Sequence, residues 1–246
     1  MLILGGTTEA IQLVGGISTD NKYDVIYSLA GVTKAPAFPP QVTTRVGGFG
    51  GGVKMAQWVQ DHQIDGIIDA THPFAQQITN NAFQVAQITQ IPYLRLERPA
   101  WEKQTGDRWL EVNSVSETVE VLGQHPQRVF LTIGRKEILP FKACSVQHSY
   151  VIRSVDYPDK VYIPQNSHII QAKGPFLLSD ELMLLKQFDI NCIVSKNSGG
   201  ETIYAKIIAA RQLGIPVIMV KRPTMPCMPT INSWQEAYQQ ISQIFG

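Results

Sequence analysis

The chain has 246 residues, of which 44% are hydrophobic and 17% are charged, and its formal net charge is +1. This length and composition exclude a disordered chain and allow either two small domains or one large one. The near-zero charge excludes a global field that would attract nucleic acid or an anionic membrane, so an anion site must come from a few basic residues placed locally.

Short apolar segments alternate with helical patterns along the whole chain, which predicts strands separated by helices. The predicted strands are residues 2–4, 24–29, 66–70, 93–96, 129–133, 150–154, 192–195 and 217–220. The predicted helices are residues 7–14, 53–63, 73–87, 115–123, 179–188, 202–213 and 233–245. Continuously apolar strands between helices indicate an α/β fold with mostly parallel sheets covered on both faces.

Local signals mark several helix ends. Ser114 with Glu117 reads as a capping box, Gly214 reads as a C-cap, and Pro73 suits a first helical position. The βα pattern occurs twice, and the polar stretch 123–127 separates the two series. We therefore expect two domains, residues 1–123 and 124–246.

The cysteines and the N-terminus indicate the compartment. Cys144, Cys192 and Cys227 are widely spaced and form no Cys-x-x-Cys pair, so neither a disulfide framework nor a metal site is expected. The first residues show no basic segment of a signal peptide, and no apolar run approaches the roughly 20 residues of a membrane span. We expect a cytoplasmic protein that binds no membrane.

Three glycine-rich segments, residues 5–6, 47–52 and 199–200, follow apolar runs and precede predicted helices. Glycine allows close backbone approach to a ligand, and a helix N-terminus offers free N–H groups to phosphate. The expected phosphate-binding residues are Gly5, Gly6, Thr7, Thr8, Gly47, Gly48, Phe49, Gly50 and Gly51. The first segment departs from the G-x-G-x-x-G fingerprint, and a tight strand-to-helix turn is its alternative interpretation.

The end of the second predicted strand bears on the choice of cofactor. Its residues 28–34 contain no acid that would bind a ribose 2′-hydroxyl, but they contain Ser28, Thr33 and Lys34. These side chains suit a 2′-phosphate and favour NADPH. An ordinary polar turn is the alternative.

Polar and basic residues gather at other predicted strand ends. His72 leaves a strand, where a histidine can donate a proton or orient a carboxylate, although a surface histidine in a capping loop is equally compatible. The basic residues are Arg95, Arg98, Arg135, Lys136, Arg153, Lys173, Lys196, Lys221 and Arg222. Their clustering indicates a small polyanionic ligand. The alternative is ordinary salt bridges to Glu97, Glu102, Glu137 and Glu201.

Several strings of residues resemble the precorrin-6A reductase family of cobalamin biosynthesis, which includes the cobalt-precorrin-6A reductases. In the first half they are residues 3–10 (ILGGTTEA), 28–31 (SLAG), 47–51 (GGFGG), 69–75 (DATHPFA) and 93–99 (YLRLERP). In the second half they are residues 132–137 (TIGRKE), 174–176 (GPF), 195–200 (SKNSGG), 204–206 (YAK) and 221–223 (KRP).

The resemblance implies two Rossmann-like domains, the first binding the cofactor and the second completing a tetrapyrrole site in a cleft between them. It implies an oxidoreductase that reduces one double bond of the precorrin-6A macrocycle to give precorrin-6B. NADPH, or alternatively NADH, would be the donor, with no metal or flavin. Neighbouring enzymes of the pathway are possible partners for product transfer; nucleic acid is not an expected partner.

The resemblance also implies roles for individual residues. The catalytic candidates are His72, Lys196 and Tyr204, and the glycine segments with Ser28 and Thr33 hold the cofactor. The substrate-binding candidates are Thr71, Arg98, Arg135, Lys136, Lys173, Asn197, Ser198 and Gly199. The family usually has an arginine where this chain has Val32, so Lys34 or Arg45 would have to compensate at a 2′-phosphate.

Three other functions remain open at this point. One is reduction of cobalt-precorrin-6A with NADH. Another is a transferase or epimerase that uses a sugar nucleotide, because its diphosphate would suit the same glycine loops. The third is a dinucleotide-binding sensor without catalysis. Fold alone does not decide between them.

Overall fold

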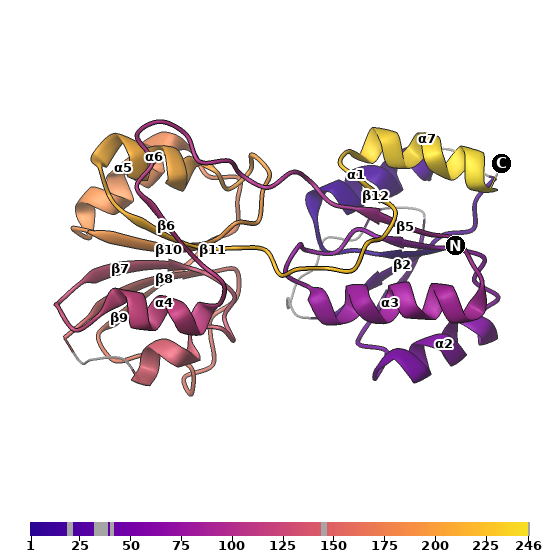
Figure 1. Cartoon of the computed structure of the whole chain (residues 1–246), viewed down its shortest axis with the longest axis horizontal. Coiled ribbons are helices and arrows are strands. Elements are labelled where there is room, and N and C mark those ends of the chain that lie inside the picture. The colour runs from indigo at the N-terminus through magenta and orange to yellow at the C-terminus, as the bar shows by residue number, and fades with distance from the viewer. Residues whose placement is uncertain (19–21, 32–38, 40–41, 144–146, 246) are drawn as a thin grey trace. The chain divides into compact units, whose positions relative to one another are not determined.

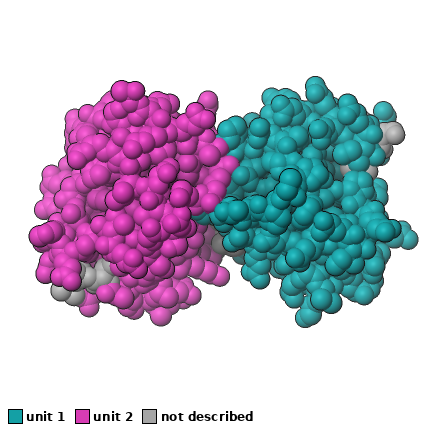
Figure 2. All heavy atoms as spheres, in the orientation of Figure 1, with its two compact units in different colours: residues 1–99, 223–246 teal, residues 100–222 magenta. Residues whose placement is uncertain are grey.

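The computed structural model describes residues 1–18, 22–31, 39, 42–143 and 147–245. Helices and strands are mixed along the chain, and four pairs of strands (β2 and β3, β5 and β6, β8 and β9, β11 and β12) follow each other without a helix between them (Figure 1). The chain forms two compact units: unit 1 comprises Met1–Pro99 with Pro223–Gly246, and unit 2 comprises Ala100–Arg222 (Figure 2). Each unit contains a six-stranded sheet whose neighbouring strands are all parallel, which confirms the predicted α/β class.

The sheet of unit 1 has the order β12-β5-β4-β1-β2-β3. Its strands are β1 (Leu2–Leu4), β2 (Ile26–Leu29), β3 (Thr43–Val46), β4 (Ile67–Asp69), β5 (Tyr93–Leu96) and β12 (Thr230–Ile231). Its helices are α1 (Thr8–Ile17), α2 (Gly52–Asp61), α3 (Gln76–Thr89) and α7 (Trp234–Phe245). Helices α1 and α7 cover one face of the sheet, and α2 and α3 cover the other (Figure 1).

The sheet of unit 2 has the order β6-β11-β10-β7-β8-β9. Its strands are β6 (Trp109–Val112), β7 (Arg128–Thr132), β8 (Ser149–Ser154), β9 (Ser167–Gln171), β10 (Cys192–Lys196) and β11 (Val217–Val220). Its helices are α4 (Val115–Leu122), the short 3₁₀ helix η1 (Leu139–Ala143), α5 (Leu178–Gln187) and α6 (Ala205–Leu213). Helices α5 and α6 pack together over one face, and α4 lies on the other (Figure 1).

Both sheets have the same arrangement when β1 and β7 are counted as strand 1 of their sheets, and β12 and β6 as strand 6. That order is 3-2-1-4-5-6, in which the chain changes direction across the sheet between strands 1 and 4. Such a switch leaves a crevice at the carboxyl ends of the strands, where open α/β sheets bind ligands. In unit 1 the switch lies between β1 and β4, and in unit 2 it lies between β7 and β10.

The outer strands β6 and β12 each pair in a different unit from the strand that precedes them along the chain. Strand β6 follows β5 along the chain but pairs with β11 in unit 2, and β12 follows β11 but pairs with β5 in unit 1. The division therefore differs from the predicted one at residues 123 and 124. A reading in chain order assigned β6 and α4 to the first half and α7 to the second, because no local signal reveals which sheet an edge strand joins.

All predicted helices and strands are present; β1, β5 and β11 have the predicted ends, and the others are shifted at one end or both. Strands β3, β6, β9 and β12 were missed because they are short and partly exposed, without a continuous apolar run. Ser114 and Gly214 are confirmed as caps, whereas α3 begins at Gln76 and leaves Pro73 in the preceding turn. In the described part of the chain, no helix has both the length and the apolar character needed to cross a bilayer.

Candidate functional site

A pocket of about 440 Å³ lies in unit 1 at the carboxyl ends of the strands. Its volume is in the usual range for a small-molecule or cofactor site. It is lined by Leu4, Gly5, Ser28, Ala30, Gly47, Gly48, Phe49, Gly50, Gly51, Thr71, Gln77, Ile78 and Asn81. The structure thus brings both predicted glycine loops of this unit and the end of β2 around one space.

The structure gives different reasons for the glycines around this pocket. An added Cβ at Gly5 would lie 2.2 Å from the Tyr27 ring, so packing inside the protein requires that glycine. An added Cβ would meet no described atom within 4 Å at Gly6, Gly47, Gly48 and Gly51. Open space above these glycines gives a ligand room to approach the backbone, which is what a pyrophosphate requires.

Helix α1 begins directly after the first glycine loop. Thr7 is its N-cap: the Thr7 hydroxyl accepts a hydrogen bond from Ala10 N at 3.1 Å and donates one to Ala70 O at 2.8 Å. This hydroxyl therefore fixes the turn instead of serving as the expected ligand donor. Thr8 opens the helix and is exposed. The N–H groups of this first turn lack intrahelical acceptors and suit an anion.

The end of β2 contacts the neighbouring strand β3. Ser28 is buried, and its hydroxyl accepts a hydrogen bond from Nη1 of Arg45 at 3.2 Å. Thr33, Val32 and Lys34 lie outside the described residues. Among the residues that the structure describes at this corner, Ser28 lines the pocket and Arg45 contacts Ser28 from the neighbouring strand.

A buried polar network holds Thr71 at the pocket wall. Asp69 is fully buried and accepts hydrogen bonds from Thr71 N at 3.0 Å, Thr71 Oγ1 at 2.7 Å and Tyr93 Oη at 3.1 Å. Arg95 donates to both Asp69 and Thr79 at 2.7 Å, so the buried carboxylate has a paired cation. Burial raises the pKa of the Tyr93 hydroxyl, which keeps it a neutral donor.

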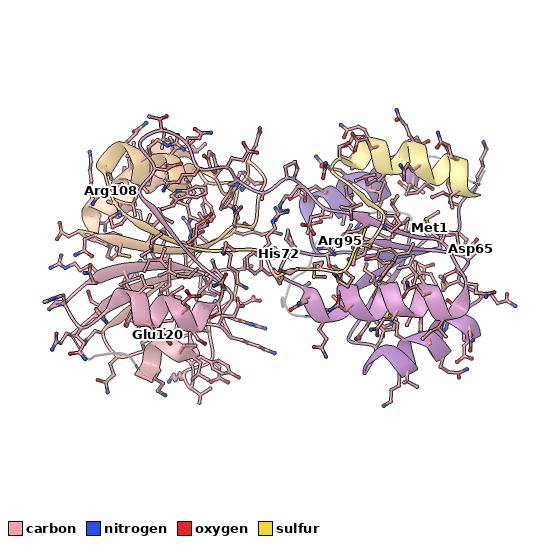
Figure 3. All side chains as sticks on the ribbon, viewed as in Figure 1. Met1, Asp65, His72, Arg95, Arg108 and Glu120 are labelled. Atoms are coloured by element: carbon pink, nitrogen blue, oxygen red, sulfur yellow. The ribbon has the colours of Figure 1, made fainter. Side chains whose placement is uncertain are left out.

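His72 follows this network at the carboxyl end of β4. Figure 3 places it at the opposite end of unit 1 from Met1 and Asp65, which pair at 3.2 Å near the amino ends of the strands. Phe74 N donates to Nδ1 of His72 at 3.2 Å. A neutral imidazole with this contact carries its proton on Nε2, which makes Nε2 the donor atom.

Arg98 lies by the first turn of α1. Its guanidinium donates to Oε2 of Glu9 at 2.8 Å, and both side chains are largely buried. This ion pair places one predicted substrate-binding residue beside the first glycine loop.

In unit 2, the predicted basic residues gather at the carboxyl edge of the sheet. Lys196 at the end of β10 forms an ion pair with Glu137, which follows the neighbouring strand β7. Arg135 pairs with Asp156 at 3.5 Å. Of the acids considered as alternative partners, Glu137 thus forms a salt bridge in unit 2, and Glu97 forms one with Arg95 in unit 1. The side chains of Lys136 and Lys173 are exposed on the same edge of the unit 2 sheet.

The side chain of Asn197 forms two hydrogen bonds with the backbone of Trp101, which the sequence did not indicate. Its side chain accepts from Trp101 N at 2.7 Å and donates to Trp101 O at 2.9 Å. Arg222 donates to the carbonyl oxygens of Asn197 at 3.0 Å and Ser198 at 3.2 Å. Ser198 and Gly199 are buried, so this loop offers little side-chain surface to a substrate.

The Tyr204 hydroxyl points away from the strand ends. It accepts a hydrogen bond at 2.9 Å from Arg211, which lies two turns further along α6 and pairs with Asp107 at 2.8 Å. The structure therefore does not bring Tyr204 together with Lys196 as a pair of proton donors.

Sequence reasoning missed the contribution of α3 to the pocket. Gln77, Ile78 and Asn81 line it from successive turns of that helix. Their spacing predicted a helix, but nothing in it identified the face that meets a ligand.

Comparisons with known proteins agree with this geometry. Residues 1–242 match the family described as precorrin-6x reductase CbiJ/CobK. A precorrin-6A reductase of Sinorhizobium sp. is 48% identical over 242 residues, covering 98% of this chain and 92% of the relative. A cobalt-precorrin-6A reductase of Priestia megaterium is 29% identical, covering 98% and 97%. The solved structure of a CobK precorrin-6A reductase superposes with a TM-score of 0.91 at 37% identity, covering 98% and 95%.

Proposed function

The chain belongs to the precorrin-6x reductase family, and from that premise we propose that it reduces metal-free precorrin-6A with NADPH. The reaction adds one hydride and one proton across a double bond of the macrocycle. Support for the metal-free substrate comes from the 48% identity to a precorrin-6A reductase, against 29% to a cobalt-precorrin-6A reductase.

The pocket of unit 1 is the observation that carries this proposal. It lies at the carboxyl ends of a 3-2-1-4-5-6 sheet, next to the N-terminus of α1 and under glycines with open space above them. These features fit a dinucleotide. When bound, the nicotinamide supplies the hydride, while the protein supplies position and electrostatics.

In unit 1, binding of the cofactor is assigned mainly to backbone groups. Gly6, Gly47 and Gly48 allow the pyrophosphate to approach, and the first turn of α1 presents N–H groups to it. Ser28 borders the adenosine ribose at the end of β2.

Substrate binding is assigned to the basic residues on the carboxyl edge of unit 2. Arg135, Lys136, Lys173 and Lys196 would bind carboxylates of the macrocycle. Glu137 and Asp156 hold Lys196 and Arg135 in place before substrate arrives, which lowers the entropy lost on binding. Asn197 positions this loop through Trp101 and does not itself need to touch substrate.

His72 is the proposed proton donor. It follows Thr71, which the buried Asp69 holds at the pocket wall, and its Nε2 carries the proton in the neutral ring. Lys196 is the second candidate, because its ammonium lies at the end of β10. Water can also deliver the proton, since correct placement of the reactants alone supplies much of a rate enhancement.

The test is to incubate the pure protein with precorrin-6A, with and without cobalt, and to compare NADPH with NADH. We expect oxidation of NADPH coupled to loss of precorrin-6A absorbance, and faster turnover without cobalt. A protein that binds the nucleotide but never oxidises it with either tetrapyrrole would instead be a sensor.

The free thiols of Cys192 and Cys227 support the proposed cytoplasmic location.

A further inference from the structure

Arg45 differs from four other arginines near strand ends in the charge of its partners. Ion pairs with acids are formed by Arg95, Arg98, Arg135 and Arg153. Arg45 instead donates to three neutral oxygens: Ser28 Oγ, Gly47 O and Gly48 O. Among the described residues no carboxylate pairs with it, so no described acid neutralises this charge next to the lining residues Ser28, Gly47 and Gly48.

The position of Arg45 in the sheet identifies which anion it would meet. Arg45 on β3 pairs in register with Ser28 on β2, and Ser28 lines the pocket. The end of the second strand is where this type of sheet receives the adenosine ribose. An acid there binds the 2′-hydroxyl of NAD, and a nearby arginine accommodates the 2′-phosphate of NADP. Here Ser28 stands at the strand end, with Arg45 beside it.

The guanidinium of Arg45 is also held rigidly. Its central carbon lies 3.7 Å from the centre of the Phe49 ring and 5.3 Å from that of Trp58. Nη1 donates to Gly47 O at 2.5 Å, and Nη2 donates to Gly48 O at 3.0 Å. These contacts do not use every N–H group of the guanidinium, so donors remain for a phosphate. A prepositioned, half-buried cation binds an anion more strongly than a mobile surface one.

We propose that Arg45 recognises the 2′-phosphate of the cofactor and makes this chain select NADPH over NADH. The inference rests on the proposed function, because it assumes that the pocket holds a nicotinamide dinucleotide. The stacked arginine comes from the neighbouring strand instead of from the loop after β2.

The first test is calorimetric and needs no turnover. Titration of wild type and Arg45→Gln with 2′,5′-ADP and with 5′-AMP isolates the 2′-phosphate. We expect Arg45→Gln to weaken 2′,5′-ADP binding about tenfold to a hundredfold, as for a lost charge-assisted hydrogen bond, and 5′-AMP binding by less than about threefold. Equal weakening of both ligands would mean that Arg45 only shapes the loop, and would overturn the inference.

Lys54 provides a matched control, because it is an exposed cation in the first turn of α2 close to the same loop. Lys54→Gln should preserve the preference for 2′,5′-ADP. A selective loss as large as that of Arg45→Gln would indicate general attraction by positive charge and would contradict recognition by Arg45.

A second variant remains informative if Arg45→Gln fails to fold. Ser28→Asp places a carboxylate beside Arg45, where it would pair with the guanidinium and accept from a 2′-hydroxyl. We expect the NADPH-to-NADH affinity ratio to fall at least about tenfold; an unchanged ratio would overturn the inference. Wild type that binds neither nucleotide contradicts the proposed function itself. Wild type that binds both equally contradicts only the role of Arg45.

Discussion

The side-chain amide of Asn197 binds both backbone polar groups of Trp101, accepting from its N–H at 2.7 Å and donating to its carbonyl at 2.9 Å. The Trp101 indole in turn donates to Gly200 O at 2.7 Å. Trp101 lies just after the chain enters unit 2, and Arg222, the last residue of unit 2, also binds this loop. Both connecting segments are therefore anchored on the loop that follows Lys196.

Asn197→Ala is expected to lower stability and weaken substrate binding together. The change leaves two backbone groups of Trp101 without their partner, which should lower the free energy of unfolding by about 1–3 kcal/mol. It also loosens the loop that carries Lys196, so the KM for the tetrapyrrole should rise. Urea denaturation and steady-state kinetics measure the two effects.

Asn113→Ala is the control for this change. Asn113 is exposed and its side-chain amide donates to Glu117 at 3.2 Å, so its loss should alter stability by less than about 0.5 kcal/mol. Equal losses of stability in the two variants would show that the hydrogen bonds of Asn197 with Trp101 stabilise the protein no more than the exposed contact of Asn113.

Gly48→Leu should block cofactor binding without unfolding the protein. Gly48 lines the pocket, does not have a positive φ, and an added Cβ there meets no described atom within 4 Å. A leucine side chain is therefore unstrained and projects into the space assigned to the nucleotide. We expect the Kd for NADPH to rise at least about tenfold, measured by fluorescence titration, with an unchanged melting temperature.

Gly15→Leu provides the matched control. Gly15 lies on the exposed side of α1, and an added Cβ there also meets no atom within 4 Å. Leucine has a better helix propensity than glycine, so stability should hold or rise while the Kd stays unchanged. Normal NADPH binding by Gly48→Leu would place the cofactor elsewhere.

Sequence patterns predicted the fold class and the loops of unit 1 because those signals are local. Gly47 and Gly48 follow a short apolar run and Ser28 lies near the end of a strand, and the carboxyl ends of parallel strands meet at one edge. The pairing of β6 with β11 in unit 2 and of β12 with β5 in unit 1 could not be predicted in the same way. An edge strand such as Thr230–Ile231 is too short to carry a pattern that specifies its partner.

Side-chain roles were harder to predict because they depend on contacts between distant residues. Asn197 and Tyr204 looked like ligand-binding residues from the loop they share. Their side chains instead bind Trp101 and Arg211 inside unit 2. Residue type at a strand end shows that a group is near the site, but the direction of its side chain is set by tertiary packing.

Arg135→Ala should raise the KM for the tetrapyrrole and leave NADPH binding unchanged. Arg135 follows the carboxyl end of β7, where its guanidinium can bind a substrate carboxylate. Loss of one charge-assisted contact should raise the KM by about tenfold, and the difference from wild type should shrink as salt is added. An unchanged KM would remove Arg135 from the substrate site.

Arg128→Ala is the control on the same strand. Arg128 stands at the amino end of β7, and its exposed ion pair with Asp189 lies at the opposite edge of the sheet. This substitution removes the same charge and should leave the KM within about twofold. A similar KM increase would show that the tetrapyrrole responds to overall charge instead of to a defined site.

Lys206→Met tests a buried cation that the proposed reaction does not use. The Lys206 ammonium is almost fully buried; it donates to Ile203 O at 2.8 Å and lies 4.9 Å from the centre of the Trp101 ring. Burial, with a smaller contribution from Arg153, lowers the pKa of Lys206 from 10.5 to about 7, although Glu181 acts in the opposite direction. Between these two pKa values the unfolded chain binds more protons than the folded protein, so Lys206 makes the wild type more stable as the pH rises from about 7 to about 10.

Chemical denaturation at several pH values should show this rise in the free energy of unfolding, at most about 1.4 kcal/mol per pH unit, in the wild type but not in Lys206→Met. Parallel curves for the two proteins would mean that Lys206 keeps an ordinary pKa in the folded state.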